Sequence, residues 1–220
     1  MKHLAMFVTA DTLHVRKDPG GESLGFVHRG SELSATEIDA TGCWAKVSGP
    51  AINGWCHLKH LMPVGADVPP WLAIAQREVG VKELPGSGHH PRILQYMATV
   101  DNLSGNNASK DETAWCSCFM NWCMEASGYI GTNSAMALSW NQWRNGKPPD
   151  PDKARLGDIA VGERVSAKSG YGHVAIFVAY DPEKKRLLLL GGNQDNAVRY
   201  SWYPIAQTKP YGKLLGFRSL

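Results

Sequence analysis

The stretch T-A-W-C-S-C-F-M-N-W-C-M-E-A-S, residues 113–127, organises the rest of the chain. Its apolar residues recur at spacings of three and four, which predicts a helix with one buried face. Asp111 or Thr113 is expected to cap this helix, because Asp and Thr side chains accept hydrogen bonds from first-turn amides. The apolar positions that set this pattern are Cys116, Phe119, Met120, Cys123 and Met124.

Cys116 falls in the first turn of the predicted helix. The unpaired amides and the aligned peptide dipoles place partial positive charge there, and this charge stabilises a thiolate. Because the thiolate is the nucleophilic form, Cys116 is the candidate for covalent catalysis. Cys118 lies about 200 degrees further round the helix, on another face. Cys123 returns to the first face about 10 Å along the axis, so we expect a core role for it.

Composition excludes several classes of protein. The chain has 220 residues, 43% hydrophobic and 20% charged, which suits one large domain or two smaller ones. Lys and Arg exceed Asp and Glu only by 23 to 20, so no charge field predicts nucleic-acid binding. No apolar run reaches the roughly 18 residues of a membrane helix, and no membrane insertion is expected.

The first residues lack a signal-peptide pattern, so synthesis in the cytoplasm without a signal peptide is expected. An odd count of five cysteines speaks against a disulfide framework.

Residues 1–63 show short runs of alternating polarity broken by Pro-Gly, Gly and Asn-Gly, which predict a small antiparallel barrel. The order L-H-V-R-K-D-P, W-A-K-V and N-G-W-C-H-L-K-H-L resembles the bacterial SH3-like domain. That resemblance implies either binding of wall peptides or simple packing beside a catalytic domain, and it leaves both open. Cys43 and Cys56 fall on strands expected to be neighbours, where a disulfide is geometrically feasible and two free core thiols are favoured.

The remainder of the chain predicts an α+β domain after a linker. Residues 64–70 form a Pro-rich linker, and residues 71–220 form the second domain. Here helical patterns come first and strand patterns follow, which favours helices packed on an antiparallel sheet. The predicted helices are 71–79, 91–100, 113–127 and 134–143, and the predicted strands are 156–161, 172–180, 186–191, 197–202 and 214–218.

His173 is the candidate base for Cys116, because it opens a strand directly after the glycine-rich loop S-A-K-S-G-Y-G. If the hairpin turns at Glu183, the numbers of paired residues sum to about 366, and His173 faces Asn193. Opposed side chains have Cβ atoms roughly 4.5 to 5.5 Å apart, so Asn193 would orient the imidazole. A slip of one residue turns Asn193 to the other face and leaves Gln194 or Asp195 in reserve.

Four motifs carry a second resemblance, over residues 71–220. In order, W-C-S-C-F, L-G-D-I-A-V, G-H-V-A-I and L-G-G-N-Q resemble the papain-like cysteine hydrolases of the NlpC and CHAP type. This implies cleavage of an amide in the peptidoglycan stem peptide, or of the bond joining that peptide to the glycan, without a cofactor. By position, Cys116 matches the family nucleophile, His173 the base and Asn193 the third residue. Trp115 and Cys118 depart from the Asp and Gly of NlpC-type members.

The same motifs bear on substrate contacts, on metal binding and on alternative functions. Trp115 and Tyr171 are expected to contact the substrate. The pattern C-x-C-x4-C lacks a matching second pair, so no metal is expected even with His89 and His90 in the chain. The alternatives for function are a thiol acyl transferase, or a wall-binding protein with an inactive papain-like scaffold.

The resemblance also bears on the biological setting. A wall hydrolase without a signal peptide fits a phage lysin or a delivered antibacterial effector that acts in the periplasm or outside the cell. Peptidoglycan is then the expected partner. An effector would add an immunity protein or a delivery machinery.

Overall fold

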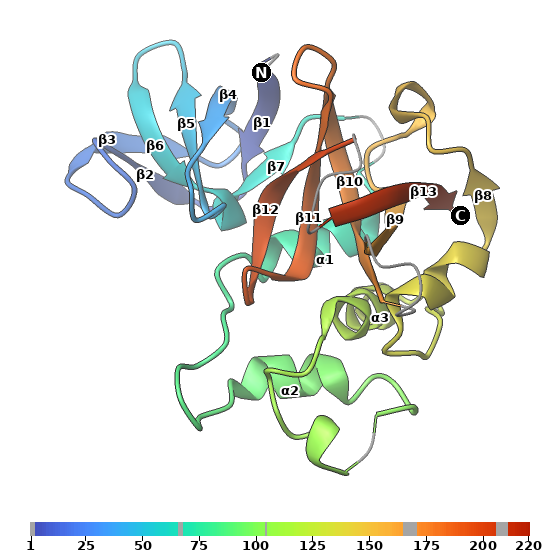
Figure 1. The fold of residues 1–220 in the computed structure, drawn as a ribbon. Helices are drawn as coiled ribbons and strands as arrows, with labels where there is room; N and C mark the ends of the chain where they lie inside the picture. Colours follow the sequence, from blue (N-terminus) through green and yellow to red (C-terminus); the bar gives the residue numbers. More distant parts are fainter. Residues whose placement is uncertain (1–2, 66–67, 104, 165–170, 206–210) are drawn as a thin grey trace.

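The computed structural model describes residues 3–220 except 66–67, 104, 165–170 and 206–210. Two antiparallel sheets and three α-helices make up most of the described chain (Figure 1). The fold is therefore mixed, with helices few and short beside the strands. No helix of the described residues is long and apolar enough to cross a membrane.

The first sheet has seven strands in the order β3-β2-β6-β5-β4-β1-β7. The predicted barrel is wrong for the described residues, because this sheet is open and its end strands β3 and β7 do not pair with each other. The contact between β2 and β6 is also narrow, at the single pair Arg16↔Trp55. The strands are β1 (Leu4–Val8), β2 (Thr12–Arg16), β3 (Ser23–His28), β4 (Glu32–Ile38), β5 (Trp44–Ser48), β6 (Asn53–His57) and β7 (Leu61–Pro63).

Three α-helices form at three of the predicted places. They are α1 (Pro70–Arg77), α2 (Pro91–Met97) and α3 (Cys116–Ala126). Both α1 and α2 start with proline, whose fixed φ suits the first helical position. The fourth predicted helix is tighter than expected: residues 137–142 form the 3₁₀ helix η3 (Ala137–Gln142). The other 3₁₀ helices are η1 (Leu58–His60), η2 (Gly105–Asn107) and η4 (Pro151–Lys153).

The predicted caps of α3 are wrong. The N-cap residue is Trp115, whose side chain makes no capping hydrogen bond to the helix. Asp111 is fully buried, and its carboxylate accepts hydrogen bonds from the backbone amides of His90 and Leu84. The long-range partners of Asp111 therefore replace the local contact that the sequence suggested.

The second sheet has six strands in the order β12-β11-β10-β9-β13-β8. The predicted register of the β10–β11 hairpin is confirmed at Ile176↔Leu190, whose numbers sum to 366. Between Phe177 and Ala179 a bulge shifts the register, so the paired residue numbers nearer the turn sum to 367. The strands are β8 (Asn145–Lys147), β9 (Ile159–Arg164), β10 (Gly172–Asp181), β11 (Arg186–Gln194), β12 (Ala197–Pro204) and β13 (Tyr211–Ser219).

Helix α3 packs across β10 and β11 of this sheet, as Figure 1 shows. Phe119 of α3 lies in the core, where its ring meets that of Tyr96 on α2 edge to face with centroids 5.1 Å apart. Strand β10 alternates between two clusters: Val174 and Ile176 join the core under the helices, and Ala175 joins a smaller cluster on the other face. The sheet is thus buried on both faces around β10.

Gln76 ties the two halves of the chain together. It is 1% exposed, its Nε2 donates to the carbonyl of Leu58, and its Oε1 accepts from the hydroxyl of Tyr200. The backbone amide of Tyr200 also donates to the carbonyl of Gly42, at 3.0 Å. Buried residues of both sheets accordingly belong to one hydrophobic cluster. The domain boundary at residues 64–70 stays a prediction, and the two regions it separates share a core.

Cys43 and Cys56 are both free thiols. Cys56 is fully buried, and burial raises its pKa to about 12. The thiol of Cys43 is half-buried and also has a raised pKa, chiefly through burial. The structure thus has the free core thiols that the sequence favoured over a disulfide.

Replacing Gln76 with leucine should destabilise the whole chain. The substitution leaves the buried Tyr200 hydroxyl without its partner and removes one of two hydrogen bonds to the Leu58 carbonyl, which also accepts from the backbone amide of Leu61; the expected cost is about 1 to 3 kcal/mol. Chemical denaturation measures the free energy of unfolding. As a control, Gln95→Leu on exposed helix surface should stay within about 0.5 kcal/mol of the parent protein. Equal stability of both variants would contradict the bridging role of Gln76.

Candidate active site

Cys116 is the first residue of α3 and is 6% exposed. The residue before it, Trp115, is fully buried, and its Nε1 donates to Oε1 of Glu83 at 2.8 Å. The indole lies against the rings of Tyr96 and Phe119, with centroids 5.9 and 6.4 Å away. Trp115 thus supports the start of the helix from the core. The contact of Trp115 with substrate stays a prediction, and the full burial of the side chain does not favour it.

The next turns of α3 are held by polar contacts to the segment that follows the helix. Ser117 Oγ donates to the carbonyl of Ser134 at 2.5 Å and accepts from Nε1 of Trp140 at 2.8 Å. Asn121 Oδ1 accepts from the backbone amides of Thr132 and Asn133, at 2.7 and 2.8 Å. These buried hydrogen bonds fix the helix, and with it the backbone of Cys116, against residues 131–134.

Cys118 and Cys123 are buried thiols with a structural role. Both are 0% exposed. Burial raises the pKa of Cys118 to about 12, and it raises the pKa of Cys123 well above the usual range. Since the thiolate is the reactive form, both residues are protonated and unreactive near neutral pH. This agrees with the helical geometry, which singled out Cys116.

His173 is the second residue of β10, and three features of its surroundings fix its ring. Its Nε2 lies 3.1 Å from Oε1 of Gln194 and 3.2 Å from the hydroxyl of Tyr203. The imidazole also stacks on the ring of Tyr203, with centroids 5.4 Å apart and planes 19° apart. Strands β11 and β12 therefore both contribute to the orientation of His173.

The amide of Gln194 sets the tautomer of His173. Its Nε2 donates to the carbonyls of Arg199, at 2.5 Å, and Leu189, at 3.4 Å, so its Oε1 is the atom that faces the imidazole. An amide oxygen only accepts hydrogen bonds, and His173 must therefore donate from Nε2. A neutral imidazole carries one N–H, which leaves the lone pair on Nδ1. The hydrogen-bond network thus assigns Nδ1 as the basic atom of His173.

A bulge explains why Gln194 occupies the place expected for Asn193. The backbone of Asn193 has a φ of 53°, and the pairing of β11 with β12 shifts register between Gly191 and Gln194. One extra residue turns the following side chain to the opposite face. The other reserve candidate, Asp195, is exposed and pairs with Arg199 at 2.7 Å. Asn193 as orienting residue stays a prediction, and the contact with His173 comes from Gln194.

Strand β11 contacts both the cysteine helix and the histidine. A Cβ built on Gly192 would lie 2.5 Å from Cζ3 of Trp115, so the start of α3 rests directly on β11. Two residues further, Gln194 binds His173. Tyr171, the other predicted substrate contact, is 65% exposed just before β10. Residues 166–170 of the predicted glycine-rich loop lie outside the described residues.

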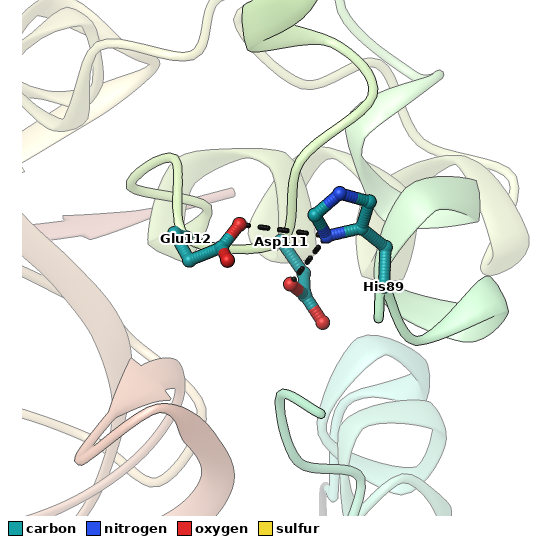
Figure 2. A group of neighbouring side chains, drawn as sticks. All are labelled: His89, Asp111 and Glu112. Carbon is teal, nitrogen blue, oxygen red and sulfur yellow. Dashed lines mark hydrogen bonds and ion pairs between the residues drawn. The ribbon is translucent and has the colours of Figure 1, made fainter. Parts of the chain in front are cut away.

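A second group of polar side chains lies before the cysteine helix (Figure 2). His89 Nδ1 lies 3.1 Å from Oδ1 of Asp111 and 3.4 Å from Oε2 of Glu112. The carboxylate of Glu83 is near enough for Asp111 and Glu112 to contribute to its raised pKa, whose main cause is burial. Local sequence patterns do not predict this group, because 22 residues separate His89 from Asp111. The only local signal was the Asp-Glu pair shortly before Cys116.

The geometry defines a class of protein. A cysteine in the first turn of a helix, on a sheet whose strand presents an amide-oriented histidine, is typical of papain-like cysteine hydrolases. The order of these residues along the chain is the order of the motifs that predicted them.

Comparison with known families agrees with this class. Residues 108–193 match the CHAP domain, over a segment that contains Cys116 and His173. This match confirms the resemblance to papain-like hydrolases of the NlpC and CHAP type; the resemblance of residues 1–63 to an SH3-like domain stays a prediction. No curated protein matches the chain.

Solved structures give weaker likenesses. NlpC1 from Trichomonas vaginalis has 14% identity and a TM-score of 0.42, covering 98% of this chain and 68% of its own. NlpC2 from the same organism has 14% identity and a TM-score of 0.41, covering 98% and 72%. An NlpC/P60 family protein from Bacillus cereus has 15% identity and a TM-score of 0.37, covering 99% and 63%.

Cys118 should resist alkylation in the folded protein. Burial raises its pKa to about 12, so it is a protonated thiol near neutral pH, and it has no exposed surface. Brief treatment with iodoacetamide near pH 7, followed by proteolysis and fragment-ion mass spectrometry, measures labelling at each cysteine. Cys118 should be labelled only after unfolding in denaturant. Labelling of Cys118 in the native state as fast as of a free model thiol would contradict this assignment.

Proposed function

We propose that this protein is a peptidoglycan hydrolase of the amidase or endopeptidase type. Its target is an amide of the wall stem peptide, or the bond joining that peptide to the glycan. Cys116 is the nucleophile, His173 the base and Gln194 the residue that orients the base. The contact between His173 Nε2 and Gln194 Oε1 carries the proposal, because in the neutral imidazole it places the proton on Nε2 and the lone pair on Nδ1. The CHAP match over residues 108–193 supports the substrate class.

The reaction follows from these roles. Nδ1 of His173 takes the proton of the Cys116 thiol, and the thiolate attacks the amide carbonyl, forming a C–S bond. The backbone amide of Cys116, at the start of α3, donates to the oxyanion together with a second donor. The protonated imidazole then gives its proton to the leaving amine, and the C–N bond breaks. Finally His173 activates a water molecule, which hydrolyses the thioester and restores the thiol.

An apolar hollow lies beside His173, on the face of the sheet away from α3, and could hold an apolar part of the substrate. Strands β9 to β13 form its walls, and Tyr203 lies on its lining beside the histidine. Apolar walls suit an aliphatic group such as the methyl of an alanine in the stem peptide. The other residues of the lining are Ala160, Gly162, Glu163, Leu187, Leu189, Pro204, Ile205, Gly212 and Leu214.

The setting proposed for this activity is the periplasm or the outside of a cell, as a phage lysin or a delivered antibacterial effector. An effector would have an immunity protein and a delivery machinery as partners. We propose further that residues 1–63 are an SH3-like unit that supports the catalytic region. Its shared core with residues 71–220, through Gln76, favours support over independent binding of the wall.

Substitution of the nucleophile or the base should abolish activity. Cys116→Ala removes the attacking sulfur, and His173→Ala removes the proton acceptor, so neither variant should release fragments from purified peptidoglycan. Cys118→Ala is the matched control and should keep most of the activity, because Cys118 is a core thiol. Mass spectrometry of defined muropeptides after digestion identifies the bond that is cut.

Three outcomes of that digestion would change the assignment. Full activity of Cys116→Ala or His173→Ala would remove these residues from the mechanism. New cross-links among the products would indicate an acyl transferase, in which an amine resolves the thioester. Binding to the wall without release by the unmodified protein would indicate an inactive scaffold.

Gln194 and its neighbour Asn193 should differ sharply. Gln194→Met keeps the size of the side chain but removes the amide, so the tautomer of His173 is no longer fixed; kcat should fall by roughly 10²-fold. Asn193→Gly is the matched control, since glycine adopts the positive φ of residue 193 without strain. The kcat of Asn193→Gly should fall by less than about threefold. The reverse ranking would assign the orienting role to Asn193.

A further inference from the structure

We propose that His89, Asp111 and Glu112 bind a divalent transition-metal ion, with Zn²⁺ as the best fit to the donors. The site would lie on the approach to the cysteine helix, outside the catalytic residues. This revises the expectation of no metal, which rested on the cysteine pattern and did not consider these carboxylates.

The distances between the donor atoms fit a tetrahedral ion. In a tetrahedron with bonds of 2.0 to 2.1 Å, neighbouring ligand atoms lie about 3.3 Å apart. His89 Nδ1 is 3.1 Å from Asp111 Oδ1 and 3.4 Å from Glu112 Oε2, and all three donor atoms lie within 4.8 Å of one another. Both carboxylates converge on a single nitrogen that carries at most one proton. Figure 2 shows this convergence of three side chains from two separate segments.

The buried carboxylate of Asp111 is oriented in advance. Its Oδ2 accepts hydrogen bonds from the backbone amides of His90, at 2.8 Å, and Leu84, at 3.2 Å. This leaves Oδ1 directed at His89. Outer hydrogen bonds that hold a ligand in place are a regular feature of metal sites. Glu112 is half-exposed, which leaves the fourth coordination position open to water.

Charge and donor type favour a zinc-like ion. In the part of the chain that the structure describes, His89 is the one basic side chain within ion-pair distance of Asp111 or Glu112. A divalent cation would therefore balance two carboxylates. One imidazole with two carboxylates suits Zn²⁺. Ca²⁺ takes six to eight oxygen ligands, and Mg²⁺ retains an octahedral shell of oxygens.

The bound ion would have a structural effect. It would join the loop at His89 to the segment at residues 111–112, just before Cys116 in the chain. Since Asp111 also binds the backbone at residues 84 and 90, the ion would stabilise the whole approach to α3. The site would thus raise the thermal stability of the folded protein, because an ion that binds only the folded state stabilises it.

Titration of the full-length, metal-free protein with Zn²⁺ tests the site. Calorimetry should show one ion bound per chain, and the Tm should rise with Zn²⁺ concentration. His89→Ala and Glu112→Gln should each weaken binding by about 10- to 100-fold or more. His90→Asn is the matched control, because asparagine keeps the acceptor that His90 supplies at the start of α2. It should bind Zn²⁺ like the parent protein.

The absorption spectrum of Co²⁺ bound to the unmodified protein distinguishes this site from binding by the five cysteines. Co²⁺ held by imidazole and carboxylates shows no thiolate-to-metal charge-transfer band, whereas binding through cysteine gives one. The proposal is overturned if neither Zn²⁺ nor Co²⁺ binds, if a thiolate band appears, or if His89→Ala binds Zn²⁺ as tightly as the parent. Binding of Ca²⁺ in preference to Zn²⁺ would equally overturn it. None of these results depends on hydrolase activity.

Discussion

The start of α3 can lie on β11 only because residue 192 is glycine. A Cβ at that position would lie 2.5 Å from Cζ3 of Trp115 and 2.7 Å from Cβ of Phe119, which are closer than real Cβ contacts. Any side chain would push the helix away from the strand and move Cys116 with it. The same strand carries Gln194, which holds the imidazole of His173. One close approach between backbone and helix therefore sets where the sulfur lies relative to the strand that orients the base.

The hairpin of β10 and β11 shows how far sequence reasoning reaches. Its register follows from the position of the turn, because antiparallel pairing fixes the sum of the paired numbers. The observed pair Ile176↔Leu190 has the predicted sum. Pairing alone could not predict the bulge that follows, since this depends on the positive φ of Asn193. The residue types did carry a signal: Asn193, Asp195 and Asn196 all adopt positive φ, and Asn and Asp tolerate that region best.

Long-range contacts account for what the sequence could not predict. Asp111 has the residue type and position of a helix cap, yet its partners are the backbone at residues 84 and 90 and the ring of His89. Trp115 can be fully buried because its indole N–H donates a hydrogen bond to Glu83, which lies 32 positions earlier in the chain. Helical periodicity is a local property of the sequence, so the helix could be predicted. The hydrogen-bond partner of each polar group depends on contacts that form only in the folded chain. Sheet closure is likewise non-local, and the first sheet stayed open although its strands were predicted.

Strand β12 connects the first sheet to the imidazole of the candidate base. At one point Tyr200 donates its amide to Gly42 and its hydroxyl to Gln76, so the strand is fixed against the N-terminal half. Three residues further, Tyr203 stacks on His173 and places its hydroxyl beside Nε2. A strand is stiff over so short a distance, and its position at Tyr203 follows from its position at Tyr200. The N-terminal sheet therefore contributes to the position of the His173 imidazole through packing, a structural role that needs no contact between this sheet and a ligand.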